Sequence, residues 1–338
     1  MKAYEVEQFG IDNLRLVDRP DPEPKAGQVL VRFHAASLNY RDLMVVSGSY
    51  NPRMRVPAVP FSDGAGEITA IGPGVTKWKA GDRVMPIFVQ HWFDGESTDE
   101  TRRTALGAGA QWDGVLREFG TFGQESVVRV PDHLSFEEAA TLPCTGVTAW
   151  NALFCSGGLK AGDTVLTLGT GGVSIFALQF AKMAGARVFS TSSSSEKIEK
   201  LLDLGADGVV NYREREDWDS AVLEFTGKRG VDHVVEVGGA GTLQRSIRAT
   251  RVSGHIALIG ALTSAAGVDP VQVFMKTLRL QGVFTGSRKM FEDMNRAISA
   301  AEFRPVIDRV FEFAEAREAL HYMESGAHFG KIVIRIGE

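Results

Sequence analysis

The residues best suited to bind an anion form a glycine-rich turn, Gly169-Thr170-Gly171-Gly172, which follows a short apolar run ending at Leu168. From Val173 onward, apolar residues recur at steps of three and four, which predicts a helix with one face packed on a sheet. A strand, a turn of small residues and a helix in this order can bind a pyrophosphate, because the backbone approaches the anion closely and the helix N-terminus offers unpaired N–H groups. The pattern predicts a dinucleotide site at Gly169, Gly171, Gly172 and Val173; a plain tight turn between strand and helix is the alternative.

One position of this turn departs from the usual G-x-G-x-x-G pattern. Ser174 stands where a third glycine normally allows the helix to approach the strand closely. Serine is the smallest polar substitute, so we expect a slightly wider contact between helix and strand rather than loss of the site.

The choice of dinucleotide depends on the residues at the end of the next predicted strand. An NAD site places an acidic residue about 20 positions beyond the glycines, where its carboxylate binds the ribose hydroxyls and repels a 2′-phosphate. Here that place holds Ser193 in a run of serines, and Lys197 follows. Hydroxyl groups and a cation suit a phosphate, so the sequence favours NADPH over NADH. Alternatively, the serines only cap the next helix and Lys197 is exposed, and both interpretations can hold because a helix N-terminus also attracts anions.

The rest of the chain divides into two kinds of sequence. Residues 1–129 contain short strands and frequent turns, as expected of a mostly β domain. Residues 130–302 alternate strands and helices, as expected of a doubly wound parallel sheet. Residues 303–338 contain a predicted helix at 314–324 and a last strand, and can return to the first domain. A chain of 338 residues is long enough for two domains, one mostly β and one α/β.

Composition and charge limit the classes of partner. The chain is 44% hydrophobic and 23% charged, with a net charge of -5 and no cluster of cations, which argues against nucleic acid as a ligand. No apolar run is long enough to span a membrane, and the first residues lack the apolar segment of a signal peptide. Cys144 and Cys155 are too few for a disulfide framework and fit a reducing compartment, so we expect a cytoplasmic protein.

Seven motifs spread over nearly the whole chain carry a family resemblance. They are LNYRDLMVVSGSY at 38–50, GPGVTKWKAGDRV at 72–84, LSFEEAATLPCTGVTAW at 134–150, GTGGVS at 169–174, LGADGVVNYR at 204–213, GVDHVVEVGG at 230–239 and GKIVI at 330–334. Together they resemble the medium-chain dehydrogenase/reductase superfamily, and within it the zinc-free branch of quinone oxidoreductases and related NADPH-dependent enone reductases. The resemblance implies a GroES-like catalytic domain, built from both ends of the chain, around an inserted Rossmann domain, with the active site in the cleft between them.

The same resemblance leads us to expect no metal. Zinc-dependent members carry a Cys-Gly-x-Asp-x-His segment, a Gly-His-Glu segment and a later cysteine. Here the first cysteine position is Asn39, and Phe61-Ser62-Asp63 replaces Gly-His-Glu. Only Cys144 remains at a ligand position, and the seven histidines show no ligand spacing. A single thiolate cannot hold a catalytic zinc ion, which needs three protein ligands.

Without a metal, reduction is the favoured direction of the reaction. Oxidation of an alcohol requires a stabilised alkoxide, whose parent hydroxyl has a pKa near that of water, about 15.7, and zinc provides that stabilisation. A quinone or an α,β-unsaturated carbonyl is already electrophilic, and hydrogen-bond donors can stabilise the negative charge that hydride addition places on its oxygen. The expected activity is therefore hydride transfer from NADPH to such a small-molecule acceptor.

The resemblance also assigns roles to individual positions near the reaction. Asn39 matches a residue near the nicotinamide, Asp42 a residue that fixes its loop, and Tyr50 a tyrosine that lines the substrate cleft. Met44 departs from the pattern, because quinone reductases often have a second tyrosine there, and it favours a more apolar acceptor. Lys331 could approach the cofactor, but an exposed surface lysine is the default expectation.

Further positions are expected to contact the cofactor. Thr148 matches a contact near the nicotinamide, and Tyr212 matches a tyrosine that quinone oxidoreductases place near the 2′-phosphate. Gly238 and Gly260 follow two strands of the predicted parallel sheet, at the edge where such folds bind ligands.

Two other functions remain open from the sequence. One is an alcohol dehydrogenase that recruits zinc through Cys144 and unusual partners, and the other is a dinucleotide-binding sensor or structural protein without turnover.

Relatives commonly pair through an edge strand of the Rossmann sheet, and residues 280–284 are the candidate strand here. We therefore expect a homodimer.

Overall fold

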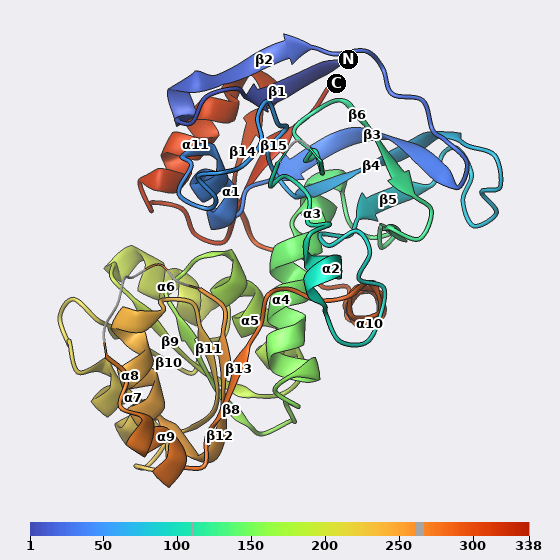
Figure 1. Cartoon of the computed structure of the whole chain (residues 1–338). Coiled ribbons are helices and arrows are strands. Elements are labelled where there is room, and N and C mark those ends of the chain that lie inside the picture. Colours follow the sequence, from blue (N-terminus) through green and yellow to red (C-terminus); the bar gives the residue numbers. More distant parts are fainter. Residues whose placement is uncertain (110, 261, 263–266, 338) are drawn as a thin grey trace. The chain divides into compact units, whose positions relative to one another are not determined.

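A computed structural model describes residues 1–109, 111–260, 262 and 267–337 of the chain (Figure 1). The chain forms two compact units, one made of Met1–Val147 with Ser287–Glu338 and the other of Thr148–Gly286. The first unit therefore joins both ends of the chain, and the middle of the chain forms the second unit. None of the helices in the described ranges has the length and apolar character needed to cross a bilayer.

These units divide the chain slightly differently from the predicted boundaries at 129/130 and 302/303. Residues 130–147 and 287–302 belong to the first unit in the structure. The reason is packing. The helix α3 (Phe136–Ala140) contacts three strands of the first unit, β3 (Gln28–Ser37), β4 (Asp63–Ile71) and β15 (Lys331–Arg335), and α10 (Arg288–Ala300) contacts β7 (Val127–Arg129) of the same unit.

The first unit is built on a seven-stranded sheet that both ends of the chain complete. The strand order is β14-β15-β3-β4-β5-β7, with β6 paired to β3, and β1 and β2 form a separate antiparallel pair. β15 is parallel to β14 and antiparallel to β3. The strands are β1 (Lys2–Val6), β2 (Leu14–Asp18), β3 (Gln28–Ser37), β4 (Asp63–Ile71), β5 (Arg83–Pro86), β6 (Phe119–Gly123), β7 (Val127–Arg129), β14 (Ile307–Glu312) and β15 (Lys331–Arg335).

Helices and single turns complete the first unit. They are η1 (Ile11–Asn13), α1 (Tyr40–Val46), α2 (Asp99–Arg102), α3, η2 (Leu142–Gly146), α10, η4 (Phe313–Glu315) and α11 (Ala316–Glu324). The helix predicted at 314–324 corresponds to η4 and α11.

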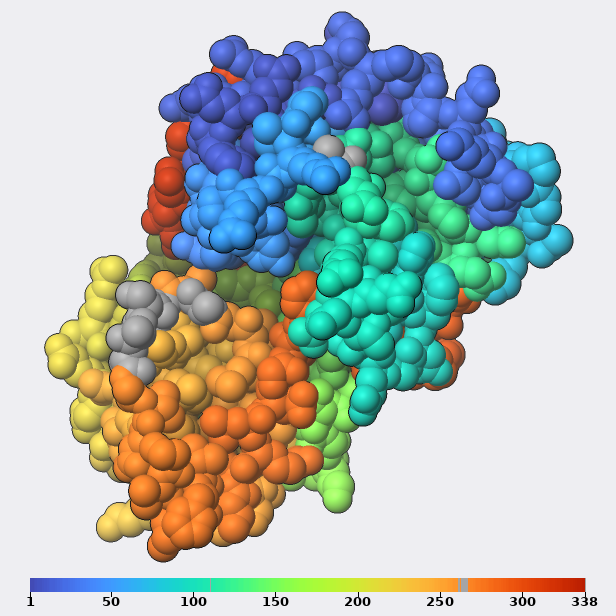
Figure 2. Space-filling view, viewed as in Figure 1, coloured from blue at the N-terminus to red at the C-terminus, as the bar shows by residue number. Residues whose placement is uncertain are grey.

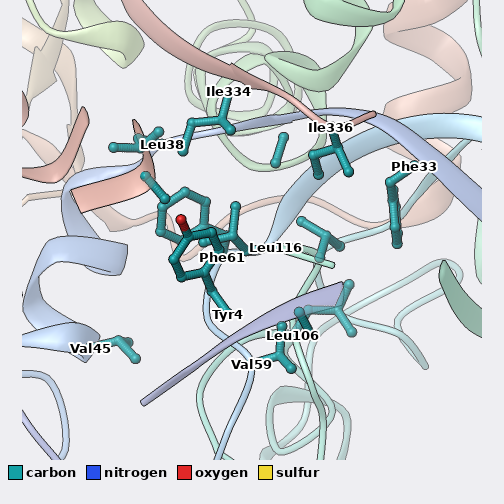
Figure 3. Close-up of a cluster of buried hydrophobic side chains, with 14 of the residues drawn as sticks. Tyr4, Phe33, Leu38, Val45, Val59, Phe61, Leu106, Leu116, Ile334 and Ile336 are labelled. Atoms are coloured by element: carbon teal, nitrogen blue, oxygen red, sulfur yellow. The ribbon is translucent and has the colours of Figure 1, made fainter. Parts of the chain in front are cut away.

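Alternation along the strands produces the core of the first unit. In β3, Val29, Val31 and Phe33 are buried, whereas Arg32 between them is exposed, as expected of a strand with one face covered. Figure 3 shows part of this core, where Tyr4 of β1, Phe33 of β3 and Ile334 of β15 belong to one buried cluster. The last strand is thus fixed by packing against residues from the beginning of the chain.

The second unit contains a six-stranded parallel sheet with the order β10-β9-β8-β11-β12-β13. Numbered along this unit, the order is 3-2-1-4-5-6, which is that of a Rossmann fold. The predicted fold class, a doubly wound domain inserted in a mostly β GroES-like domain, is confirmed. The strands are β8 (Thr164–Leu168), β9 (Arg187–Ser192), β10 (Gly208–Asn211), β11 (Val231–Glu236), β12 (Thr250–Leu258) and β13 (Arg279–Gly282).

Helices connect successive strands of this sheet and pack against it. They are α5 (Gly172–Met183), α6 (Ser195–Asp203), α7 (Trp218–Phe225), α8 (Ala240–Ala249) and α9 (Pro270–Met275). Before β8 come α4 (Val147–Trp150), which begins at the last residue of the first unit, and η3 (Asn151–Cys155). Because all six strands are parallel, their carboxyl ends meet along one edge, where the predicted cofactor residues other than Thr148 lie.

Candidate active site and cofactor site

The glycine-rich turn lies between β8 and α5, as the sequence predicts. Gly169 has a φ of 69°, a left-handed conformation that favours glycine, and its N–H donates to Thr191 Oγ1 of β9 at 3.1 Å. Gly171 is the N-cap residue of α5 and provides no side-chain cap, so the N–H groups of the first turn, including those of Gly172 and Val173, face outward from the helix end. A Cβ atom at Gly171 would meet no described atom within 4 Å, which leaves a cradle that an anion can fill.

Ser174, at the position of the third glycine, is accommodated by a hydrogen bond. Its side chain is 2% exposed, and its hydroxyl donates to Leu168 O at 2.6 Å. The serine therefore ties the first turn of α5 to the end of β8.

The residues predicted to bind the 2′-phosphate come together at the ends of β9 and β10. Tyr212 N donates to Ser192 O at 2.9 Å, so Tyr212 and the serine run are neighbours at this edge, and Tyr212 is 40% exposed. Ser194 caps α6, because its hydroxyl accepts a hydrogen bond from Lys197 N at 3.4 Å. The serine run thus caps α6, as the alternative interpretation predicts, but Lys197 in the first turn of the helix is partly buried rather than exposed. Ser193 is left at the strand end.

Gly238 and Gly260 follow the ends of β11 and β12. The turn after β11 is held by a buried carboxylate that was not identified from the sequence, that of Glu236. Glu236 is fully buried, and its Oε1 accepts hydrogen bonds from Gly238 N at 2.8 Å, Gly239 N at 3.0 Å and Thr242 Oγ1 at 2.6 Å. A Cβ at Gly260 would lie 1.9 Å from Val237 O, so only glycine fits there. An acidic residue ending an apolar strand just before Gly-Gly was the available signal for Glu236.

Thr148 lies apart from the glycine-rich loops in the sequence, in α4. It is 2% exposed and is the first residue of the second unit.

Asn39 and Asp42 form a capping box at the start of α1 in the first unit. Asn39 is the N-cap residue, and Asp42 Oδ2 accepts a hydrogen bond from Asn39 N at 2.8 Å. Both are buried, at 8% and 0% exposure. Burial raises the pKa of the Asp42 carboxyl to about 6, and the nearby Arg41 guanidinium opposes that rise.

Arg41 connects this capping box to Tyr50. Its Nη1 lies 3.3 Å from Asp42 Oδ1 and donates to Leu106 O at 3.0 Å. The guanidinium carbon lies 5.0 Å from the centre of the Tyr50 ring and 4.9 Å from that of Phe88. Tyr50 is 38% exposed, so of the three predicted catalytic residues it is the one with a side chain open to a substrate.

Lys331 is not an exposed surface lysine, and that expectation is wrong. It begins β15, is only 2% exposed, and its ammonium donates to Leu38 O at 2.6 Å, Asn39 Oδ1 at 2.6 Å and Thr145 Oγ1 at 3.0 Å. The partners come from segments nearly 200 residues or more away in the sequence, so no local pattern signals this burial.

Hydrogen bonds also link Asn39 to the positions where zinc-dependent members have their remaining ligands, which are Ser62-Asp63 and Cys144 in this chain. Its Nδ2 donates to Ser62 Oγ at 3.3 Å, and the Ser62 hydroxyl donates to Asp63 Oδ1 at 3.0 Å. Asp63 Oδ2 accepts a hydrogen bond from Cys144 N at 3.1 Å. Burial raises the pKa of the Cys144 thiol to about 12, so the group is a neutral thiol at pH 7. We call Asn39, Ser62, Asp63, Cys144, Thr145 and Lys331 the Lys331 network.

Comparison with known proteins places this arrangement in a family. Residues 25–132 match the alcohol dehydrogenase GroES-like domain, and residues 172–300 match the zinc-binding dehydrogenase domain. The chain is 43% identical over 335 residues to a zinc-type alcohol dehydrogenase-like protein of Schizosaccharomyces pombe, which covers 97% of this chain and 96% of that protein. The chain belongs to the medium-chain dehydrogenase/reductase superfamily. It is an oxidoreductase of that type.

Members of the superfamily with different activities are similar to this chain. An acryloyl-coenzyme A reductase of Metallosphaera sedula is 30% identical, over 93% of this chain and 94% of that one. A solved NAD-dependent alcohol dehydrogenase has a TM-score of 0.91 at 32% identity and covers 100% of both chains. A mycobacterial protein solved in complex with NADPH has a TM-score of 0.82 at 30% identity, over 99% of this chain and 100% of that chain.

The name of one matching domain implies zinc, but the residues present do not fit it. In the described ranges, no three His, Cys, Asp or Glu side chains are grouped as a metal site requires. At the corresponding place in this chain, Cys144 is a neutral thiol and the Lys331 ammonium donates into the cluster. A cation bound there would meet the repulsion of the ammonium group and only one carboxylate of the network, Asp63. The nicotinamide cofactor of the superfamily, by contrast, fits the open cradle at the N-terminus of α5.

Proposed function

We propose that this protein is an NADPH-dependent, metal-independent reductase that transfers hydride to a quinone or an α,β-unsaturated carbonyl. The observation that carries the proposal is the Lys331 network, in which an internal ammonium group donates to Asn39, the residue at the position of the first zinc-binding cysteine. The acryloyl-coenzyme A reductase among the relatives acts, by its name, on an α,β-unsaturated thioester, which supports the acceptor class.

The proposed acceptor follows from the chemistry that the site can supply. An alkoxide needs a Lewis acid, whereas an enone or quinone oxygen needs only hydrogen-bond donors while it gains negative charge. Bound NADPH would supply the hydride. The protein would hold the acceptor, fix its oxygen and exclude water.

We assign roles in the first unit accordingly. Tyr50, which is partly exposed and lies against the Arg41 guanidinium, is the proposed contact for the acceptor. Asn39 is proposed to lie at the nicotinamide, and Asp42 holds the Asn39 backbone at the start of α1. Met44 replaces a tyrosine of quinone reductases, so we propose an acceptor with more apolar surface than a simple quinone.

We propose NADPH rather than NADH because of the groups at the end of β9. Ser193 replaces the acidic residue that would repel a 2′-phosphate, and Lys197 lies in the first turn of α6, where the helix N-terminus also favours an anion. Tyr212 adjoins this position from β10. The pyrophosphate is assigned to Gly169, Gly171, Gly172 and Val173, and the ribose and nicotinamide to Thr148, Gly238 and Gly260.

Cofactor binding tests this assignment. We expect tighter binding of NADPH than of NADH, and we expect Lys197→Ala to weaken NADPH binding about tenfold, or about 1.4 kcal/mol, while NADH binding stays unchanged. The matched control is Lys200→Ala, one turn further along α6, where the lysine pairs with Glu196 at 2.8 Å. Titrating the fluorescence of wild type and of both variants with each dinucleotide measures the dissociation constants.

The other outcomes point to the alternatives. A preference for NADH together with stoichiometric zinc in the purified protein would favour an alcohol dehydrogenase. Tight NADPH binding without oxidation across a panel of quinones and enones would favour a sensor or structural protein.

We also propose a homodimer that pairs through β13. The helix that precedes this edge strand in the chain, α9, presents Val271, Phe274 and Met275 at 55%, 70% and 66% exposure. Its segment belongs to the orange part of the second unit in Figure 2. Such apolar exposure on one short helix is typical of an interface. We expect sedimentation equilibrium to give a dimer, and Phe274→Asp to shift it toward monomer. A monomeric wild-type protein would contradict the proposal.

A further inference from the structure

The hydrogen bonds of Lys331 require its amine to be protonated. Its nitrogen has three partners, and Leu38 O and Asn39 Oδ1 can only accept. The Thr145 hydroxyl donates to Asn39 Oδ1 at 2.6 Å, so toward Lys331 it too accepts. Three acceptors use all three N–H groups of an ammonium ion, and a neutral amine could not satisfy them.

The same contacts fix the orientation of the Asn39 carboxamide. Its oxygen receives hydrogen bonds from Lys331 and from Thr145, both at 2.6 Å. Its nitrogen must therefore point the other way, toward Ser62. If the carboxamide were rotated by half a turn, its N–H groups would face the Lys331 ammonium, which can only donate, and this contact is unfavourable in a buried site.

The ammonium group also balances a buried carboxylate. Burial raises the pKa of Asp63, and Lys331 is the strongest of the charges that oppose this rise. Cys144 and Ser62 donate to Asp63 by hydrogen bonds, and Arg41 lies at Asp42, the other buried carboxylate of this region. The charge of Lys331 thus acts on both Asp63 and Asp42, whereas Arg41 lies in direct contact with Asp42.

We propose that Lys331 is a positioning residue of the active site: as a built-in cation in place of the metal, it holds the Asn39 carboxamide in one orientation and balances the charge of Asp63. This inference rests on the proposed function, because it assigns Asn39 to the site of hydride transfer. Lys331 itself is enclosed and acts through Asn39. A fixed charge and a fixed amide require no reorganisation during the reaction, which is how preorganised polar groups accelerate it.

The first variant is Lys331→Met, which keeps the length of the side chain and removes the charge. We expect kcat for NADPH-dependent reduction to fall about 100-fold, the loss typical of a misplaced active-site group, while NADPH affinity changes less than twofold, because the residues proposed to bind the pyrophosphate and the 2′-phosphate belong to the other unit. The control is Lys77→Met in the same unit, whose lysine is half-exposed and pairs with Glu125. A kcat equal to that of the control overturns the inference.

A second variant separates positioning from stability. Loss of Lys331 leaves Asp63 without its cation, so Lys331→Met lowers the unfolding midpoint in urea, and adding Asp63→Asn restores part of that loss. We expect the double variant to recover stability and to keep the low kcat. Recovery of kcat together with stability would show that Lys331 only balances charge, and strictly additive effects on stability would show that it does not couple to Asp63; each overturns the inference.

A third measurement does not depend on turnover. The side-chain amide signals of Asn39 in an NMR spectrum of the protein without cofactor are expected to shift in Lys331→Met and to stay in place in Lys77→Met. Unchanged signals overturn the inference. A wild-type protein that binds NADPH and reduces no acceptor would refute the proposed function alone, and these signals would still decide whether Lys331 orients Asn39.

Discussion

Two regions of the molecule bury ionisable side chains in opposite ways. In the first unit, the Lys331 ammonium has three hydrogen-bond acceptors and a carboxylate to balance it. In the second unit, His233 and His255 lie in register on β11 and β12, with ring centres 5.8 Å apart and exposures of 5% and 1%. His233 Nε2 lies 3.1 Å from Asp163 Oδ2, whereas both ring nitrogens of His255 lack a partner among the described residues.

The difference shows what a buried ionisable group needs in order to keep its charge. Lys331 is protonated because its surroundings supply oxygen acceptors, although burial lowers the pKa of its amine. His255 has none of these partners, so burial lowers the pKa of its imidazole to about 4, and the nearby His233 and Arg279 contribute to the shift. The first group is suited to orient a polar site, and the second serves as a neutral part of the sheet's packing.

The largest expected effect comes from removing the positive charge of Lys331, whose ammonium group has three hydrogen-bond acceptors. Lys331→Met is expected to lower the free energy of unfolding by roughly 3–5 kcal/mol, because the carboxylate it balances stays buried. Urea unfolding at pH 7 measures this loss, with Lys77→Met as the control at less than about 0.5 kcal/mol. A loss below about 1 kcal/mol would mean that the Lys331 network is not held by this charge.

A smaller, pH-dependent effect on stability is expected at His255, whose imidazole has no hydrogen-bond partner among the described residues. Since its pKa is near 6.5 in the unfolded chain and about 4 in the folded chain, the unfolded chain binds more protons between these values, and stability falls as the pH falls through this range. His255→Leu is therefore expected to gain about 2 kcal/mol relative to wild type on going from pH 7.5 to pH 5.

Urea unfolding of His255→Leu at the two pH values tests this expectation, and replacing the exposed His91 by leucine is the control. If wild type and His255→Leu lose equal stability between pH 7.5 and pH 5, the imidazole of His255 does not titrate in the way that the comparison requires.

The smallest effect concerns a polar group of the second unit that does have a partner. Ser174→Ala removes the hydrogen bond to Leu168 O and is expected to cost about 1 kcal/mol of stability. NADPH affinity should remain within twofold, because the hydroxyl points to the strand and not to the cradle. A large loss of affinity at unchanged stability would instead place Ser174 in the binding site.

The dinucleotide fold could be predicted because its signals are local. The turn at 169–172 lies between one strand and one helix, and the serine run follows at the end of the next strand, so about 30 residues contain the pattern. Ser174 was recognised as a departure, but its hydrogen bond to Leu168 could not be predicted from residue type alone. Glu236 was missed because its partners are backbone N–H groups of a turn whose shape only the structure shows.

The Lys331 network could not be predicted because four separate segments assemble it. Its members come from positions 39, 62–63, 144–145 and 331, and no spacing in the sequence links them. The sequence identified Asn39, Asp63 and Cys144 as replaced or retained ligand positions, but a lysine is exposed in most proteins, so its burial was unexpected. Only the pairing of β15 with β3 brings the end of the chain to the start of α1.

The most direct test of the account is the rate of NADPH oxidation with an α,β-unsaturated ketone, measured on the protein after removal of metals by a chelator and again after zinc is added back. We predict the same rate in both samples, because the residues at the ligand positions do not form a zinc site and an internal ammonium group donates to one of them. An activity that disappears with the chelator and returns with zinc would contradict the central claim.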